Sequence, residues 1–301
     1  MSSRVCRLRS RAGIPAPEAI VDPRSIVHPM RLFKEPAELD LMRRAAAITR
    51  EAHEGAARLA QPSVYEYELQ ALIEYTFRRR GAHGSAYTTI VGGGSNATVL
   101  HYVSNSQKLR EDELVLIDAG CELEGYASDV TRTYPIGGRF TGPGRDIYEL
   151  VLRAQLASLE QCRPGRTLAD VHDASVRTIA EGLIELGLLE GDPAELVARE
   201  AYRPYYMHMT SHWLGLDVHD VGDYRIDGEH RPLEPGMVFT VEPGVYVAPD
   251  AELADPRFAG IGVRIEDDVA IHEDGHENLT GSIPKEPDEL EALVASGGEA
   301  G

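Results

Sequence analysis

The chain has 301 residues, of which 43% are hydrophobic and 26% are charged, a balance typical of a soluble globular protein. Its formal net charge of −19 argues against nucleic acids and anionic membranes as partners, because both bind basic surfaces. The three cysteines form no zinc-finger spacing, and no apolar run is long enough to span a membrane. Together with the lack of a secretory signal, this predicts a cytoplasmic protein.

The first part of the chain predicts a lead-in followed by a helix pair. Residues 1–30 are first Arg-rich and then Pro-rich, which indicates a flexible lead-in. A helix is predicted over 36–59, with a proline in its first turn. A second helix is predicted to begin at a capping box made by Ser63 and Glu66, and Gly81 ends it.

The remainder of the chain alternates strands and helices. Strands are predicted near residues 87–91, 99–103, 114–121, 127–134, 237–242, 245–247, 262–266 and 269–271. Helices are predicted at 145–161, at 167–186 with a cap from Thr167 and Asp170, and at 193–200. A helix pair followed by strands occurs twice, which predicts an α+β domain over 31–290 with an internal duplication, and then a frayed tail at 291–301.

A Gly-rich segment and a His-rich segment are the first candidate sites. Residues 92–96 lack the Gly-Lys-Ser/Thr of a phosphate-binding loop, so a sharp turn is favoured there. His208, His212 and His219 lie within twelve residues of each other. Met209 follows His208 where a helical zinc motif has Glu, which excludes that motif. A metal half-site, a pH-sensitive loop and a chance cluster all remain open for this segment.

Four acids indicate which of these interpretations is favoured. Asp118, Glu242 and Glu266 each end an apolar run that is typical of a buried strand. Asp129 lies eleven residues after Asp118, and a hairpin turning near 123–124 would place the two opposite each other on one face. The alternative is that both are exposed acids in turns.

Charge then predicts a metal centre, if these acids are buried together. Unpaired ions in a low-dielectric interior cost several kcal/mol each, whereas a pair of divalent cations offsets several carboxylates. Oxygen ligands with one imidazole favour Mn²⁺ and allow Co²⁺, Fe²⁺ or Zn²⁺. Arg264 shares a strand face with Glu266, as its structural partner or as a substrate-binding group. Asp267 and Asp268 are interpreted as solvated or structural.

These residues occur in the order and local contexts of the pita-bread metallopeptidases, and within them the sequence resembles the bacterial Xaa-Pro aminopeptidases (aminopeptidase P). The motifs that carry the resemblance are at residues 116–120, 126–129, 131–133, 211–215, 241–244 and 264–267. The resemblance covers about residues 30–293. It implies the pita-bread (creatinase/aminopeptidase-like) fold, with a curved mixed sheet flanked by helices and pseudo-twofold halves.

The resemblance also implies a site and a reaction. The implied ligands of two divalent ions are Asp118, Asp129, His212, Glu242 and Glu266. The implied substrate-binding and catalytic groups are His101, His208, His219 and Arg264, with Glu242 as general base and His219 stabilising the oxyanion. The implied reaction releases the N-terminal residue from peptides with proline in the second position.

The sequence departs from the family pattern at two places. Met209 stands where a small or polar residue is usual, which affects the shape of the pocket. The family carries a further N-terminal domain, of which we expect only a remnant in residues 1–30. A homo-oligomer is left open. A proline dipeptidase, a methionine aminopeptidase and a weakly catalytic peptide- or protein-binding module are the alternative functions.

Overall fold

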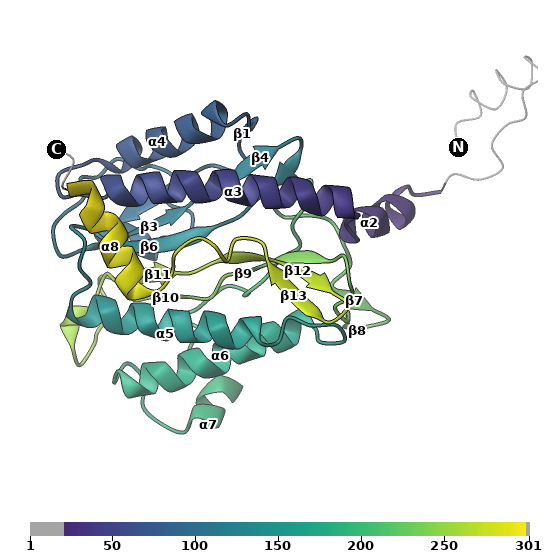
Figure 1. Ribbon diagram of the computed structural model, residues 1–301. Coiled ribbons are helices and arrows are strands. Elements are labelled where there is room, and N and C mark those ends of the chain that lie inside the picture. Colours follow the sequence, from purple (N-terminus) through teal and green to yellow (C-terminus); the bar gives the residue numbers. More distant parts are fainter. Residues whose placement is uncertain (1–20, 299–301) are drawn as a thin grey trace, which may run out of the picture.

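The computed structural model describes residues 21–298 and places strands between two groups of helices (Figure 1). On one side lie α3 (Pro36–Leu59) and α4 (Glu66–Arg79), and on the other lie α5 (Gly142–Leu159) and α6 (Leu168–Glu185). The shorter helical elements are α2 (Arg24–Leu32), α7 (Pro193–Ala198), α8 (Pro287–Gly298), η1 (Gly94–Thr98) and η2 (Pro256–Phe258). The predicted α+β class is confirmed.

Two three-stranded antiparallel sheets form the centre of the fold. The first has the order β2 (Ile90–Gly93), β3 (Leu114–Asp118), β6 (Thr131–Pro135). The second has the order β13 (Gly275–Asn278), β12 (Asp267–His272), β9 (Val238–Val241). Each sheet follows a helix pair in the sequence, so the same order of elements occurs twice, as the predicted duplication requires.

The remaining strands form one further three-stranded sheet of short strands and two two-stranded sheets. They are β1 (Gly84–Ser85) with β4 (Cys121–Leu123) and β5 (Tyr126–Ala127), β10 (Gly244–Tyr246) with β11 (Gly262–Arg264), and β7 (Arg225–Ile226) with β8 (Glu229–His230). Every pair of named strands in residues 21–298 is antiparallel. The predicted mixed sheet is therefore observed as several short antiparallel sheets.

Helix α3 lies close to the strands because its inner face is made of small residues. It begins at Pro36, where a missing N–H costs nothing, and the Glu38 carboxylate accepts the N–H of Glu35 at 2.6 Å. The buried inner face includes Ala45, Ala46, Ala52, Ala56 and Ala57. The Sγ atom of Cys121 lies 3.4 Å from the carbonyl oxygen of Ala45, a separation that a larger side chain on this face would prevent.

The start of α4 corrects a sequence-based prediction. The Glu68 carboxylate accepts the N–H of Tyr65 at 2.7 Å, so the capping pair is not Ser63 with Glu66. Ser63 instead has a φ of 74°, because the chain turns sharply before the helix begins. The side chain of Glu66 is fully buried and is used elsewhere.

Four other predictions differ from the structure in position or extent. Residues 99–103 form no strand, and β2 begins only at Ile90. Helix α2 lies in the predicted lead-in. The predicted tail at 291–301 is helical through Gly298, because Leu290 and Val294 are buried beside α3. The parts of the lead-in and tail at 1–20 and 299–301 lie outside the described residues.

Trp213 anchors the His-rich segment to the second sheet. Its side chain is fully buried, stacks on Tyr224 with ring centroids 5.4 Å apart, and meets the edge of Phe239 at 6.0 Å. The backbone of Trp213 also bridges that of Phe239 in β9. Aromatic packing of this kind fixes the direction of the chain on both sides of the indole. No helix within residues 21–298 is both long and apolar enough to cross a membrane.

Candidate active site and metal centre

The β3–β6 hairpin brings Asp118 and Asp129 to one face of the first sheet. Asp118 pairs with Thr131, so the two aspartates are diagonal neighbours. The prediction that they lie directly opposite each other is therefore wrong in register. Gly120 is required in this hairpin, because a Cβ there would lie 1.7 Å from the carbonyl oxygen of Ser128. Both aspartates are buried, which excludes the alternative of exposed turn acids.

The two glutamates come from the second half of the chain. Glu242 follows β9, and its N–H donates to the carbonyl of Thr210 at 2.8 Å. Glu266 links β11 to β12, and its N–H donates to the carbonyl of Thr131 at 3.1 Å. The hydroxyl of Thr131 donates to Oε2 of Glu266 at 2.6 Å. Backbone hydrogen bonds thus tie Glu266 to β6 of the first sheet and Glu242 to the His-rich segment.

His212 presents a free ring nitrogen to the acids. Its Nδ1 lies 3.1 Å from the carbonyl oxygen of Trp213, and because a carbonyl only accepts, Nδ1 carries a proton. The Nε2 atom lies 3.4 Å from Oδ2 of Asp129 and 3.5 Å from Oε1 of Glu242. A carbonyl that orients the distal nitrogen in this way is the usual support of a metal-binding histidine.

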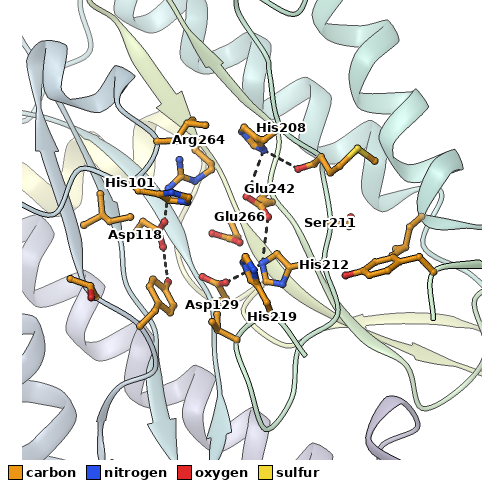
Figure 2. A pocket seen from close by; sticks show the side chains of 18 of the residues that line it. His101, Asp118, Asp129, His208, Ser211, His212, His219, Glu242, Arg264 and Glu266 are labelled. Carbon is orange, nitrogen blue, oxygen red and sulfur yellow. Dashed lines mark hydrogen bonds and ion pairs between the residues drawn. The ribbon is translucent and has the colours of Figure 1, made fainter. Parts of the chain in front are cut away.

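These groups fit a divalent cation. Ligand atoms of Asp129, His212 and Glu266 all lie within 4.8 Å of one another, and Figure 2 shows Asp118 and Glu242 beside them. Oxygen-rich donors with one imidazole are the ligand set of Mn²⁺ and similar ions. The arrangement supports the predicted metal centre.

The electrostatics of the cluster support the same interpretation. Burial, and then the charges of Asp129 and Glu242, raise the pKa of Glu266 well above its usual value. Burial raises the pKa of Glu242 to about 7. Burial alone would lower the pKa of His212, but Asp129 and Glu242 raise it to about 9. The carboxylates are therefore destabilised together unless positive charge lies among them.

Arg264 is the buried arginine closest to these acids. It donates to Asp118, to the hydroxyl of Thr131 at 3.0 Å and to the hydroxyl of Tyr246 at 3.0 Å. The predicted pairing with Glu266 is therefore replaced by pairing with Asp118. Tyr87 donates a second hydrogen bond to Asp118, at 2.6 Å. The sequence offered no signal for Tyr87 or Tyr246, because both reach the site only through tertiary packing.

The other three predicted histidines line the same pocket (Figure 2). Nδ1 of His208 faces the carbonyl of Met209 at 2.8 Å, so its Nε2 accepts from Tyr246 at 2.9 Å. Burial, followed by the charge of Arg264, lowers the pKa of His208 to about 4. The ring of His219 lies 4.1 Å from that of His212 between centroids. His101 also lines the pocket, and its side chain is exposed.

The pocket has a volume of about 830 Å³ and combines this polar floor with apolar walls. The apolar lining residues include Ile90, Leu100, Val103, Leu168, Met209 and Val218. Met209 is 58% exposed at the rim. Arg225 and His230 of the β7–β8 hairpin, which the sequence did not indicate, also face the pocket.

Asp267 and Asp268 are structural. Asp267 is buried and pairs with Arg132 at 2.7 Å and Lys285 at 2.6 Å. Asp268 is buried and accepts the N–H of Asp129 at 3.1 Å. The prediction that they are structural is confirmed, whereas the solvated alternative is wrong. Asp268 fixes the backbone of one candidate metal-binding residue.

Comparisons with known proteins agree with this geometry. The model of metallopeptidase family M24 matches residues 40–273. The chain is 51% identical to the Xaa-Pro aminopeptidase of Escherichia coli (strain K12) over 290 residues, which is 96% of this chain and 65% of that protein. It thus spans slightly less than two thirds of that relative.

Solved structures show the same fold. Aminopeptidase PepP of Pseudomonas aeruginosa matches with a TM-score of 0.96 and 48% identity, over 98% of this chain and 67% of that chain. Aminopeptidase P from E. coli with the inhibitor Pro-Leu matches with a TM-score of 0.94 and 50% identity, over the same shares of the two chains. The predicted pita-bread fold is confirmed, and the chain belongs to metallopeptidase family M24.

Proposed function

We propose that this protein is a metal-dependent aminopeptidase that releases the N-terminal residue from peptides with proline in the second position. The observation that carries the proposal is the convergence of five side chains of metal-binding types, from segments between 118 and 266, on the floor of one pocket. The E. coli relative is named Xaa-Pro aminopeptidase, and its solved structure holds the inhibitor Pro-Leu. Residues 31–290 form the proposed catalytic unit.

The proposed metal ligands are the buried acids and the imidazole of the cluster, namely Asp118, Asp129, His212, Glu242 and Glu266. Their donor atoms favour two divalent ions, with Mn²⁺ first. When bound, such ions polarise a peptide carbonyl and activate water. The carboxylates around them also attract the positively charged amine at the free end of a peptide, which favours an exopeptidase over an endopeptidase.

Glu242 is the proposed general base. Its Oε1 faces His212, while Oε2 lies 3.9 Å from Nδ1 of His208 on the pocket side. A carboxylate placed there accepts a proton from the attacking water. It then returns the proton to the leaving nitrogen, which departs as the secondary amine of proline when the C–N bond breaks.

The proposed roles of the other groups follow from their protonation and position. Burial, followed by the charge of His212, lowers the pKa of His219, so it is a neutral donor for the developing oxyanion. His101, His208 and Arg264 are proposed to orient the peptide. The apolar walls suit the pyrrolidine ring, which has hydrocarbon faces and no N–H to satisfy.

The test is a cleavage assay on three peptide classes with chelated and Mn²⁺-loaded protein. We expect Mn²⁺-dependent release of the first residue from X-Pro-Y tripeptides, and slower cleavage of X-Pro dipeptides and of Met-Ala-Y peptides. Preference for dipeptides would favour a proline dipeptidase, and preference for Met-Ala-Y would favour a methionine aminopeptidase. Metal binding or peptide binding without any cleavage would favour a binding module.

Two further sequence-based expectations stay proposals. Cys121 and Cys162 are both buried and free, which supports the proposal of a reducing compartment such as the cytoplasm. The homo-oligomer is proposed from the family resemblance alone, and sedimentation of the purified protein tests it. The proposed partners are peptides, with no nucleic acid and no membrane, because the net charge of −19 disfavours both.

A further inference from the structure

The pocket wall that carries His101 is a long irregular segment. Between β2 and β3 the chain contains the η1 turn and otherwise no regular element. We define residues 93–107 as the His101 loop. The imidazole of His101 is exposed, and within residues 21–298 it makes no side-chain hydrogen bond. Its place in the pocket therefore depends on the path of the backbone around it.

One buried carboxylate binds this loop at four points. Oε1 of Glu66 accepts from the N–H of Gly93 at 2.8 Å and from Nδ2 of Asn96 at 2.9 Å. Oε2 accepts from the hydroxyl of Tyr102 at 3.0 Å and from the N–H of Gln107 at 2.8 Å. The N–H of Glu66 in turn donates to the carbonyl of Gln107 at 3.0 Å. Both ends and the middle of the loop thus meet at one side chain.

The charge of Glu66 makes this contact strong. The side chain is fully buried in the first turn of α4. No Lys or Arg of the described chain forms an ion pair with it. A buried carboxylate without a counter-ion is tolerated only when its lone pairs are filled, and hydrogen bonds to an ionised acceptor are stronger than neutral ones. Since all four donors belong to the loop, opening the loop would leave the charge unsatisfied.

Asn105 supports the loop from the other side. It is buried, with a φ of 43°, and its Oδ1 accepts the N–H of Val91 at 2.9 Å. Its Nδ2 donates to Oε1 of Gln70, one turn along α4 from Glu66, and to the carbonyl of Thr89, both at 2.8 Å. Helix α4 is therefore hydrogen-bonded to the loop on both sides of His101.

We propose that Glu66 is a positioning residue, which fixes the His101 loop so that His101 faces the peptide. The substrate role of His101 rests on the proposed function, whereas the hold of Glu66 on the loop does not. None of the five candidate metal-binding residues lies on the loop. The contribution of Glu66 is therefore separable from the metal centre.

The main test compares Glu66→Gln with the matched control Glu68→Gln in the same turn of α4. A glutamine at 66 turns an NH₂ group toward two of the four donors, and an NH₂ group cannot accept their hydrogen bonds. Backbone amide hydrogen exchange across 93–107 therefore rises, while bound Mn²⁺ stays at the wild-type level. Cleavage of X-Pro-Y falls about 100-fold, mainly through a higher KM, as expected when a binding group is displaced. Glu68 is exposed and its amide still accepts from Tyr65, so the control keeps wild-type exchange and cleavage.

A double variant separates positioning from general destabilisation. If Glu66 acts through His101, the variant with both Glu66→Gln and His101→Ala is no slower than His101→Ala alone. Losses that multiply, or unchanged exchange in Glu66→Gln, would overturn the proposal. If the wild-type protein cleaves no X-Pro peptide, the proposed function fails, but the exchange comparison still decides whether Glu66 holds the loop.

Tyr102→Phe keeps the test decisive if Glu66→Gln does not fold. This change removes one of the four donors without burying a new polar group, and it leaves the carboxylate in place. We expect higher exchange in the loop and a loss in cleavage of about 10-fold, the scale of one hydrogen bond to a charged group. Unchanged exchange in Tyr102→Phe would contradict the proposal.

Discussion

The floor and the walls of the pocket are built in different ways. The floor consists of acids at the ends of strands, such as Asp118 and Glu242, which are joined to neighbouring chain segments by backbone hydrogen bonds. The walls carry His101 and His219 on irregular segments. Groups that share a metal ion must keep distances to a fraction of an ångström, whereas groups that contact varied peptides need only a defined path of the chain. The fold supplies rigidity in the first region and tethered loops in the second.

The largest effect is expected on the floor, from Glu266→Gln. Because burial and the charge of Asp129 raise the pKa of Glu266, the metal-free variant should be about as stable as the wild type. With Mn²⁺, the variant should lose the increase in melting temperature that ligand binding gives. Turnover should fall roughly 1000-fold, since a metal ion lowers such barriers by several kcal/mol.

Thermal unfolding with and without Mn²⁺, together with steady-state rates, measures both effects. Glu195→Gln, at an exposed position of α7, is the control and should behave as wild type. An unchanged Mn²⁺-dependent shift in Glu266→Gln would contradict a place for this residue in the metal centre.

The next effect is expected from Arg264→Lys, at the border between floor and walls. The guanidinium donates in three directions at once, to Asp118, Thr131 and Tyr246, and an ammonium cannot reproduce that fork. We expect a roughly 100-fold loss of kcat/KM from the disturbed geometry. Arg257→Lys, in an exposed pair with Asp255, is the matched control, and equal rates in both variants would refute the special role of Arg264.

A smaller effect, on stability, is expected beneath the floor at His53. This histidine is fully buried between the carbonyl of Ala119 and the hydroxyl of Tyr134, and burial lowers its pKa to about 4. Between pH 6.5 and 4 this histidine is therefore protonated in the unfolded chain but neutral in the folded protein. Stability from this group is complete above pH 6.5 and is lost as the pH falls, by about 2 kcal/mol between pH 7 and 5.

Urea unfolding of metal-free protein at the two pH values measures this loss. His53→Gln should show a correspondingly smaller difference between pH 7 and 5, while His230→Gln, at an exposed position, should keep the wild-type difference. An identical pH dependence in wild type and His53→Gln would show that His53 is not the titrating group.

The contrast between floor and walls also explains what the sequence could predict. Asp118, Glu242 and Glu266 each follow an apolar strand, and the strand pattern is local, so their burial was predictable. Their convergence on one site was implied by the family resemblance. The diagonal offset of Asp118 and Asp129 depends on hairpin register, which no local pattern specified. The pairing of Arg264 with Asp118, in place of Glu266, depends on the packing of β11 against β6.

The walls were less predictable because their order comes from distant contacts. Residues 99–103 have the apolar pattern of a strand but are held as a loop by Glu66 in α4. Glu66 itself was interpreted as a capping residue, because a buried acid and a helix cap look alike in sequence. The β7–β8 hairpin turns at Asp227 and Gly228, which is a typical hairpin sequence. That the hairpin reaches the pocket depends on tertiary packing, which no local pattern specified.

The most direct test of the metal centre is a titration of Mn²⁺ into chelator-treated protein, with bound metal and X-Pro-Y cleavage measured on the same samples. We expect no cleavage without metal and full activity when two ions are bound per chain. Full cleavage by metal-free protein, or Mn²⁺ binding that survives the loss of both Asp129 and Glu266, would contradict a catalytic metal centre at this site.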